Sequence, residues 1–355
     1  MFRILDWYIG RTILMSSLLV LVTLQSLSMI VKFVEQLGSV GQGDYQVVDA
    51  LWYVLLSVPR ELEIFFPMAA LLGALIGLGS LASTSELVVM QSAGLSRFNI
   101  ASAVLKTAVP MMIAMMLLGE YVAPSSDLAA KQLRSSKMSG GSLVAVQRGI
   151  WAKDGDSFVS IGEVQESKDI FNITIYRFNQ NADLYQQVEG ERAIYDKDYW
   201  LIDQAVVTDF SDDGVTRQHF DRYRWNSSLT PEKLSVVTIK PHDLSISGMY
   251  SYISYLQQNH QDPARYQLAL ARKLMMPILT GIMMLLALSF VFGPLRSSSM
   301  GAKIMMGVVA GFSYYILDQV LGSMSLVYGV PPYVSAAIPS ALVLGIALYL
   351  INRRA

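Results

Sequence analysis

The chain has 355 residues, of which 53% are hydrophobic and only 15% are charged, and its formal net charge is −1. Soluble domains usually carry about a quarter charged residues, so this composition favours a membrane protein. The balanced charge excludes a general attraction to nucleic acid, and the absence of cysteine excludes disulfides, thiolate zinc sites and a cysteine nucleophile.

Six stretches of the chain are apolar over about 20 residues, the length that a helix needs to cross a bilayer. Three of them precede Tyr121 and three follow Arg265, with a polar stretch between them. The spans are Ile13–Val31, Ile64–Leu81, Ile100–Leu118, Leu274–Phe292, Ile304–Val327 and Tyr333–Ile351. We therefore predict an α-helical membrane protein with six transmembrane helices, arranged 3+3, and an inserted all-β domain. The predicted segments are 1–123, 124–265 and 266–355.

The segment that joins the second and third spans is predicted to contain a short helix between residues 83 and 94. Ser83 and Glu86 have the spacing of a capping box, in which the hydroxyl accepts from backbone N–H groups and the carboxylate reaches back. Gly94 suits the left-handed position that ends a helix. Helical spacing places Leu87, Met90 and Gln91 on one face, and Glu86 also aligns with Met90. The segment is either a plain interfacial connector or a coupling helix that docks on a cytoplasmic motor.

The polar insertion, residues 124–265, is predicted to be β-structure. In Phe171–Phe178, Phe171, Ile173 and Ile175 alternate with Asn172, Thr174 and Tyr176, and this period of two indicates a half-buried strand whose apolar face would include Phe171. Further strand candidates, separated by turn signals, are Ser157–Gly162, Ala193–Tyr195, Tyr199–Ile202, Ala205–Phe210, Gln218–Trp225 and Leu234–Ile239. Many short strands at this spacing favour a sandwich, a barrel or a jelly roll. The segment Ser251–Gln258 is predicted to return the chain to the membrane as a helix.

Basic residues near the span ends set the predicted orientation, because cytoplasmic loops carry an excess of Lys and Arg. With the N-terminus in the cytoplasm, the short loops Glu35–Asp49 and Tyr328–Pro332 face outward and carry no Lys or Arg. The cytoplasmic ends then carry Arg3, Arg11, Arg97, Lys106, Arg296, Lys303, Arg353 and Arg354. We therefore predict cytoplasmic termini and an external insertion, which in a bacterial inner membrane lies in the periplasm.

Most of the ionisable residues within and beside the spans lie near their outer ends. Charge inside a membrane is costly, so such groups face a cavity, pair with each other or reach the interface. The basic residues are Lys32, Arg60, Lys131, Arg134, Arg272 and Lys273, and the acidic residues are Glu61, Glu63 and Asp318. Anchoring or local ion pairing explains any one of these charges. As a set, the cations would ring one mouth that suits the phosphates of an anionic lipid, and the acids would preorganise the cations or compete with the substrate for them.

Common catalytic motifs are absent from the sequence. There is no phosphate-binding G-x-x-x-x-G-K-[ST] loop and no H-E-x-x-H metalloprotease motif. The histidines at positions 219, 242 and 260 are too scattered to favour a metal site. We predict that the chain has no catalytic residues and binds no metal or cofactor of its own.

Long motifs in the chain resemble the LptF/LptG family of lipopolysaccharide exporter permeases, and the resemblance covers essentially the full length. The motifs are IFFPMAALLGALIGLG (Ile64–Gly79), SELVVMQSAG (Ser85–Gly94), GIWAKDG (Gly149–Gly155), LSISG (Leu244–Gly248), ALSFVFGPLR (Ala287–Arg296) and LDQ (Leu317–Gln319). SELVVMQ and FGPLR favour the paralogue that pairs with LptF over LptF itself. The resemblance implies a permease subunit of an ABC-type exporter. Such a subunit extracts lipopolysaccharide from the outer leaflet of the inner membrane and passes it to a periplasmic β-jellyroll bridge.

The same resemblance implies partners and residue roles. The chain would form a heterodimer with LptF, be driven by two copies of the ATPase LptB with ATP and Mg²⁺, and act with LptC and indirectly with LptA. The first and fifth spans would form a lateral gate. Glu86 matches the family's coupling-helix acid facing LptB, and Lys32 matches a cavity lysine associated with lipopolysaccharide phosphates. Lys131 and Arg134 match basic positions above the cavity, whereas Ser39 lies in a segment where relatives place lysines.

Two other classes of protein stay open at this point. A membrane-anchored envelope receptor or scaffold would use its β-domain to sense a ligand, but it would normally need a cytoplasmic output domain, and none is visible in the sequence. A membrane enzyme acting on envelope lipids would need a catalytic cluster, which the sequence does not show. The exporter reading accounts best for both the charged mouth and the short cytoplasmic loop.

Overall fold

The computed structural model describes residues 4–138, 150–155, 157–165, 169–179, 183–196, 199–211, 214–227, 229–230, 244–293 and 298–352. The predicted strand Leu234–Ile239 lies outside these residues, as do the basic residues Arg3, Arg296, Arg353 and Arg354. The chain forms two compact units. The first comprises Met1–Glu35, Val54–Asp127 and Ala264–Ala355, and the second comprises Gln36–Tyr53 and Leu128–Pro263.

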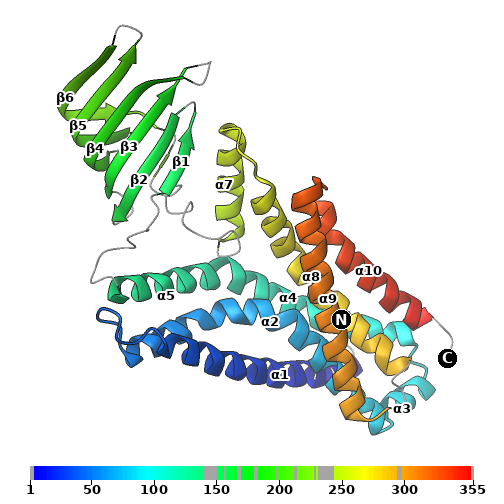
Figure 1. The fold of residues 1–355 in the computed structure, drawn as a ribbon. Coiled ribbons are helices and arrows are strands. Elements are labelled where there is room, and N and C mark those ends of the chain that lie inside the picture. The colour runs from blue at the N-terminus through cyan, green and yellow to red at the C-terminus, as the bar shows by residue number, and fades with distance from the viewer. Residues whose placement is uncertain are drawn as a thin grey trace. The chain divides into compact units, whose positions relative to one another are not determined.

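Six helical segments among the described residues are long and apolar enough to cross a membrane, which confirms the predicted six spans. They are α1 (Ile4–Leu37), α2 (Val47–Ser83), α4 (Arg97–Leu117), α8 (Ala264–Phe292), α9 (Met300–Tyr328) and α10 (Pro332–Asn352) (Figure 1). The third span continues from α4 through a π-helical turn, η1 (Leu118–Val122), into α5 (Ala123–Met138). Away from its ends and its prolines, such a helix bonds its backbone groups within itself, as the interior of a membrane requires.

The core of the first unit lies around α2 and α8. In their most apolar stretches 72% of residues are buried, against 17% for α1 and 6% for α9. Glycines allow α1 and α2 to approach closely, because a Cβ at Gly73 would lie 2.3 Å from the Ser17 Cα atom. Small residues commonly serve this purpose between membrane helices. The least buried spans, α1 and α9, therefore present most of their side chains to the surroundings of this chain.

The second unit contains a six-stranded antiparallel sheet, in which consecutive strands pair in the order β1 to β6 (Figure 1). This confirms the inserted all-β domain. The strands are β1 (Ile150–Asp154), β2 (Ser157–Gln165), β3 (Asp169–Phe178), β4 (Leu184–Asp196), β5 (Tyr199–Ser211) and β6 (Gly214–Trp225). Tyr199–Ile202 and Ala205–Phe210, predicted as separate strands, are one strand that continues through Gln204, which has a φ of 51°. The first half of β4 was not predicted because it is largely polar.

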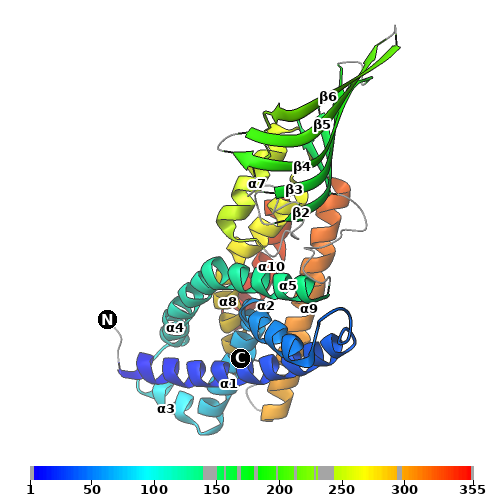
Figure 2. The same cartoon turned by 90° about the vertical axis from the view of Figure 1, so that its left-hand side faces the viewer.

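One row of residues crosses the sheet without regular ladder pairing. In the registers of the five strands β2 to β6, Gly162, Asn172, Glu191, Gln204 and Asp221 would face one another in turn, and each neighbouring pair is missing from the ladder. Asn172 has a φ of 53°, so it reverses the alternation within β3. Ile170 and Ile173 are therefore both buried, whereas Phe171, predicted to point inward, is partly exposed. The strands curve along their length in Figure 2, and such interruptions allow a sheet to bend.

The helix that follows the sheet is held against the β1–β2 turn of the same unit. This helix, α7 (Ile246–Gln258), begins at Ser245, whose side chain accepts from the Gly248 N–H. The Tyr255 hydroxyl donates to the Lys153 carbonyl at 2.7 Å, and the Asn259 side chain accepts from the Gly155 N–H at 2.9 Å. Burial, aided by the nearby Asp154 carboxylate, raises the pKa of Tyr255 to about 12. The helix predicted at Ser251–Gln258 is thus present and begins five residues earlier.

Candidate functional site

The first of the three predicted acids, Glu61, pairs with the predicted cation Lys32. The Lys32 ammonium lies 2.6 Å from Glu61 Oε1, although not in hydrogen-bond geometry, so the contact is a close ion pair between α1 and α2. The second Glu61 oxygen accepts from the Gln25 amide at 2.8 Å. The Glu61 side chain is 7% exposed and that of Lys32 is 33% exposed. The Lys32 side chain is therefore partly accessible, and the nearly buried Glu61 carboxylate neutralises its charge.

The second carboxylate, Glu63, is shared by two predicted cations. Arg60, one turn earlier on α2, contacts Glu63 Oε2 at 2.6 Å, and Lys273 of α8 lies 3.8 Å from Glu63 Oε1. The side chains of Glu63 and Lys273 are 6% and 8% exposed, so the group is nearly buried. The Arg60 Nε atom is buried without a hydrogen-bond partner in the part of the chain that the structure describes. Glu63 therefore joins α2 to α8 through charge.

Glu63 also fits against the π-helical turn of the third span. A Cβ atom at Gly119, within η1, would lie 2.8 Å from Glu63 Oε1. The carboxylate thus occupies space that any larger residue at position 119 would fill. Wide turns of this kind are rare within helices and often occur at functional sites. The π-turn and the glycine together admit the carboxylate beside the third span.

The third carboxylate, Asp318 of α9, holds Arg272 of α8. The Arg272 Nη2 atom donates to the Asp318 backbone carbonyl at 2.6 Å and lies 3.0 Å from Asp318 Oδ2. The three predicted acids therefore contact four of the six predicted cations, and all four lie in the first unit. Both proposed roles of the acids, to preorganise those cations or to compete with a substrate for them, stay predictions. The same ion pair is expected in either case.

The other two predicted cations, Lys131 and Arg134, lie on α5 in the second unit. Lys131 is exposed. Arg134 donates to the Ser39 hydroxyl at 3.2 Å, and its guanidinium lies 5.7 Å from the centre of the Tyr53 ring. Arg134 therefore holds the α1–α2 loop against α5 within this unit. One ring containing all six cations stays a prediction.

The predicted coupling segment forms the helix α3 (Glu86–Ser92), but its start differs from the prediction. Ser83 is still part of α2, and its hydroxyl donates to the Ser80 carbonyl. The residue before α3 is Ser85, which has a φ of 62° and makes no side-chain cap. The capping-box prediction is therefore wrong, because α2 extends through Ser83. Gly94 does have the predicted left-handed conformation, with a φ of 96°.

The predicted docking face of α3 is also divided. Leu87 and Met90 are 2% and 7% exposed and belong to the core of the first unit, so their side chains face inward in this chain. Leu87 and Met90, which share a face by their helical spacing, lie on the inward face of α3. The exposed apolar residues are instead Val88 and Val89, 49% and 65% exposed. Gln91 is partly exposed.

Glu86 is placed by two hydroxyl groups. One of its oxygens accepts from the Tyr8 hydroxyl of α1 at 2.8 Å, and the other accepts from the Thr84 hydroxyl at 2.9 Å. The side chain stays partly exposed. Glu86 is therefore a carboxylate with a fixed orientation that links α3 to the first span. The Tyr8 contact joins residues 78 positions apart, so no local sequence pattern indicates it.

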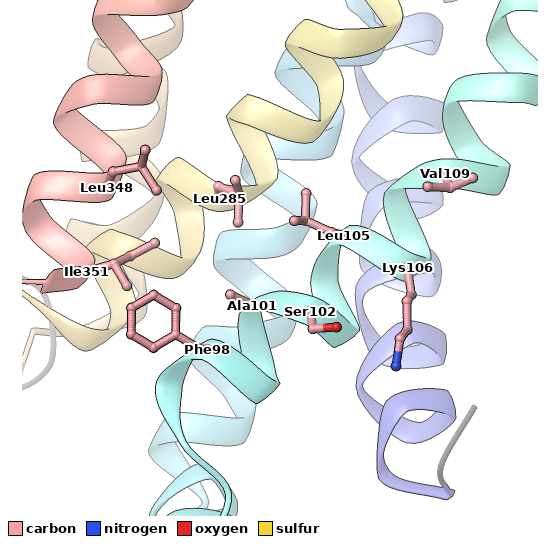
Figure 3. Close-up of a pocket in the computed structure, with 9 residues that line it drawn as sticks. All are labelled: Phe98, Ala101, Ser102, Leu105, Lys106, Val109, Leu285, Leu348 and Ile351. Atoms are coloured by element: carbon pink, nitrogen blue, oxygen red, sulfur yellow. The ribbon is translucent and has the colours of Figure 1, made fainter. Parts of the chain in front are cut away.

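An apolar pocket of about 410 Å³ lies between α4, α8 and α10 (Figure 3). Its lining residues are Phe98, Ala101, Ser102, Leu105, Lys106, Val109, Leu285, Leu348 and Ile351. In Figure 3 the Lys106 ammonium lies at the far edge from Leu348 and Ile351, and it contacts Asp6 at 2.7 Å. No cluster of three or more potential metal-ligating residues occurs within the described ranges.

The amino-acid sequence of the chain is similar to those of known proteins. The family described as lipopolysaccharide export system permease LptF/LptG matches residues 7–353. The chain is 45% identical over 356 residues to the lipopolysaccharide export system permease protein LptG of Escherichia coli strain K12, covering 99% of each chain. It is 44% identical over 357 residues to LptG of Haemophilus influenzae, covering 100% of this chain and 99% of the relative. It is 29% identical to LptF of Escherichia coli strain K12 over 168 residues, 46% of each chain.

Proposed function

Because this chain belongs to the LptF/LptG family of lipopolysaccharide export permeases, we propose that it is the transmembrane permease subunit of an ABC-type lipopolysaccharide exporter. In this role it extracts lipopolysaccharide from the outer leaflet of the inner membrane and passes it to a periplasmic β-jellyroll bridge. The observation that carries the proposal is the 45% identity with an LptG protein across 99% of both chains. The match to an LptF protein covers only 46% of this chain, which disfavours the LptF reading.

The proposed location is the inner membrane of a Gram-negative bacterium. Both termini lie in the cytoplasm and the β-domain lies in the periplasm. This orientation follows from the basic residues near one set of span ends, because short cytoplasmic loops are enriched in Lys and Arg. It places α3 on the cytoplasmic side and the ion pairs of Lys32, Arg60, Lys273 and Arg272 toward the outer leaflet.

The proposed partners are LptF as the heterodimer partner, two copies of LptB, LptC, and LptA indirectly. LptB supplies ATP hydrolysis with Mg²⁺, and this chain is non-catalytic and binds no cofactor. The surface that α3 offers to LptB contains Val88 and Val89 in place of the predicted Leu87 and Met90. Glu86 is held in place by hydroxyl groups at 2.8 and 2.9 Å, and beside it are the exposed side chains of Val88 and Val89.

The intramembrane ion pairs support a substrate with phosphate groups. In the first unit, each of Lys32, Arg60, Lys273 and Arg272 contacts a carboxylate. A cation in a membrane needs such a partner because its unpaired charge is costly there. A phosphate can replace a carboxylate at a guanidinium or ammonium, because both anions accept charge-assisted hydrogen bonds. Binding of lipopolysaccharide would thus be an exchange of anions, and the carboxylates would receive the cations again after the lipid leaves.

Affinity purification of the full-length chain from native membranes, followed by mass spectrometry of proteins and lipids, tests this proposal. We expect to recover the ATPase LptB, LptF and lipopolysaccharide together with the chain. A matched sample of an unrelated six-span protein from the same membranes controls for abundant lipid. Recovery of the chain with neither an ATPase nor enriched lipopolysaccharide would contradict the exporter role and favour a receptor or an enzyme.

A further inference from the structure

The contact between Arg272 and Asp318 has unusual geometry. A single nitrogen, Arg272 Nη2, serves both the Asp318 backbone carbonyl at 2.6 Å and the Asp318 carboxylate at 3.0 Å. Because Nη2 carries two hydrogens, it can donate one to each oxygen. The Nε hydrogen of the same guanidinium is buried and has no acceptor among the described residues. The guanidinium therefore contacts one residue of α9 through a single nitrogen, and its Nε–H donor stays available.

A glycine in α9 makes this contact possible. A Cβ atom at Gly322 would lie 2.2 Å from Arg272 Nη2 and 2.9 Å from its Cζ atom. Gly322 follows Asp318 by four residues, so in an α-helix its N–H points to the Asp318 carbonyl, which also accepts from Arg272. Without a side chain, Gly322 leaves a notch through which the guanidinium reaches that carbonyl. Alanine would fill the notch and displace the guanidinium.

The rest of α9 buries little of its surface against the first unit. Only 6% of its apolar stretch is buried, although neighbouring α8 is 72% buried in the same measure. Gly307 approaches α2, where a Cβ atom would lie 2.5 Å from Leu75 Cδ1. Neutral hydrogen bonds join α9 to α10, such as that from the Ser335 hydroxyl to the Leu321 carbonyl at 2.9 Å. In the described part of the chain, α9 makes its ion pair through Asp318, with Arg272 of α8.

We propose that Arg272, Asp318 and Gly322 form a releasable contact, the α9 latch, which fixes α9 on α8 until a phosphate group of the substrate takes the guanidinium. Arg272 and Asp318 are thus positioning residues for α9. This inference rests on the proposed function, because that function supplies the phosphate-bearing lipid. Two features of the guanidinium favour exchange. A phosphate offers several acceptor oxygens to a planar guanidinium, and Arg272 has an unused Nε donor.

The exchange explains why release would depend on the substrate. A guanidinium pulled away from Asp318 without a new anion would leave two uncompensated charges within the membrane, which is costly. A phosphate removes that cost for Arg272, and Asp318 is 21% exposed, so its carboxylate can reach solvent or take up a proton. A lipid of the same shape without phosphates lacks the competing anion and should leave the latch closed.

Distance measurement between spin labels on α8 and α9 tests the latch. The chain has no cysteine, so Leu274→Cys and Val320→Cys add the two labelling sites, both at exposed positions two residues from the latch, 41% and 49% exposed. The full-length chain would be measured in a maltoside detergent, which carries no phosphate. We expect one narrow distance distribution, broadened by added lipopolysaccharide and left narrow by enzymatically dephosphorylated lipopolysaccharide.

Two variants break the latch without lipid. Asp318→Asn keeps the side-chain volume and removes the charge, and Gly322→Ala fills the notch, so each should broaden the distribution. Gly311→Ala is the matched control, because a Cβ there would lie 3.5 Å from Met68 Cγ, an ordinary contact, and the distribution should stay narrow. Asp318→Asn carries the test if Gly322→Ala does not fold.

Three results would overturn the latch. Narrow distributions in both variants would mean that other contacts hold α9. Equal broadening by the two lipids would mean that phosphate does not release it. Broadening in the variants with no effect of lipopolysaccharide on the parent chain would refute the exchange. In that last case the purification described above separates the causes: lipopolysaccharide and LptB recovered with the chain leave the exporter role intact, and their absence refutes that role as well.

Discussion

The Lys32–Glu61 pair yields the sharpest prediction about substrate binding. Glu61→Gln keeps the shape of the side chain and an oxygen for the Gln25 amide, but it removes the negative charge that lies 2.6 Å from Lys32. If lipopolysaccharide phosphates bind Lys32, they no longer have to displace a carboxylate, and lipid affinity should rise. Lys32→Ala should lower it.

The size of the effect follows from the exposure of the pair. An exposed ion pair contributes up to about 1 kcal/mol, and breaking a buried one costs about 3–5 kcal/mol. Because the Lys32 side chain is 33% exposed, solvent screening favours the lower end of this range. About 1.4 kcal/mol corresponds to a tenfold change in a dissociation constant, so Glu61→Gln should bind lipid roughly tenfold more tightly.

The assay is lipopolysaccharide binding to the assembled complex in detergent, with the double variant included. Lys32→Ala alone leaves Glu61 buried without its cation, which is strongly destabilising for a buried pair, so the double variant is needed to separate binding from folding. It should bind as weakly as Lys32→Ala, because Glu61 acts only through Lys32. Lys106→Met, which removes the cation of another ion pair within the spans, at 2.7 Å from Asp6, should leave affinity unchanged. Equal affinity of Glu61→Gln and the parent chain, or additive effects in the double variant, would show that Glu61 does not compete with lipid phosphates for Lys32.

Three further predictions concern other parts of the molecule. Glu86→Ala should reduce the LptB recovered with the chain, whereas Tyr8→Phe, which removes only the 2.8 Å hydroxyl contact, should reduce it less; unchanged LptB recovery in Glu86→Ala would exclude the coupling role. Gly119→Ala should lower the melting temperature of the chain, because its Cβ would lie 2.8 Å from the Glu63 carboxylate, whereas Gly345→Ala, with open space around it, should not; equal melting temperatures would show that Glu63 can move aside. Since Tyr255 has a pKa of about 12 in the folded chain and about 10 when unfolded, the stability that its neutral form gives the second unit is present below pH of about 10 and lost toward pH of about 12. Urea unfolding of the full chain followed by tryptophan fluorescence should show this loss, and Tyr255→Phe should remove it; the same pH dependence in that variant would assign the loss to another group.

Hydropathy alone predicted the membrane architecture well, because the cost of unpaired backbone and charge in a bilayer leaves few alternatives to apolar helices. Strand positions were predicted less well for a physical reason. Asn172 and Gln204 have positive φ values of 53° and 51°, which break the period of two, so Phe171 was wrongly placed inside and β5 was divided. The sequence pattern does not show such a conformation in a residue other than glycine.

The sequence predicted which charged residues belong to the candidate site, but only the structure shows which of them form ion pairs. Lys32 and Glu61 are 29 positions apart, as residue numbers show, and Arg272 and Asp318 are separated by 46. No local pattern links such residues. The inward orientation of Leu87 and Met90 was missed for a related reason, because helical spacing identifies a shared face but does not say whether that face meets the core or a partner. Gly119 and Gly322 gave no signal, since their role lies in the space that they leave to another helix.

The measurement that tests the exporter role most directly is ATP-driven transfer of lipopolysaccharide in reconstituted vesicles. The complex of this chain with LptF, LptB and LptC would be placed in vesicles that contain lipopolysaccharide, with purified LptA outside as the acceptor. We expect lipopolysaccharide to move to LptA only with ATP and Mg²⁺, and more slowly when this chain carries Lys32→Ala. A correctly assembled complex that hydrolyses ATP but transfers no lipopolysaccharide would contradict the exporter role.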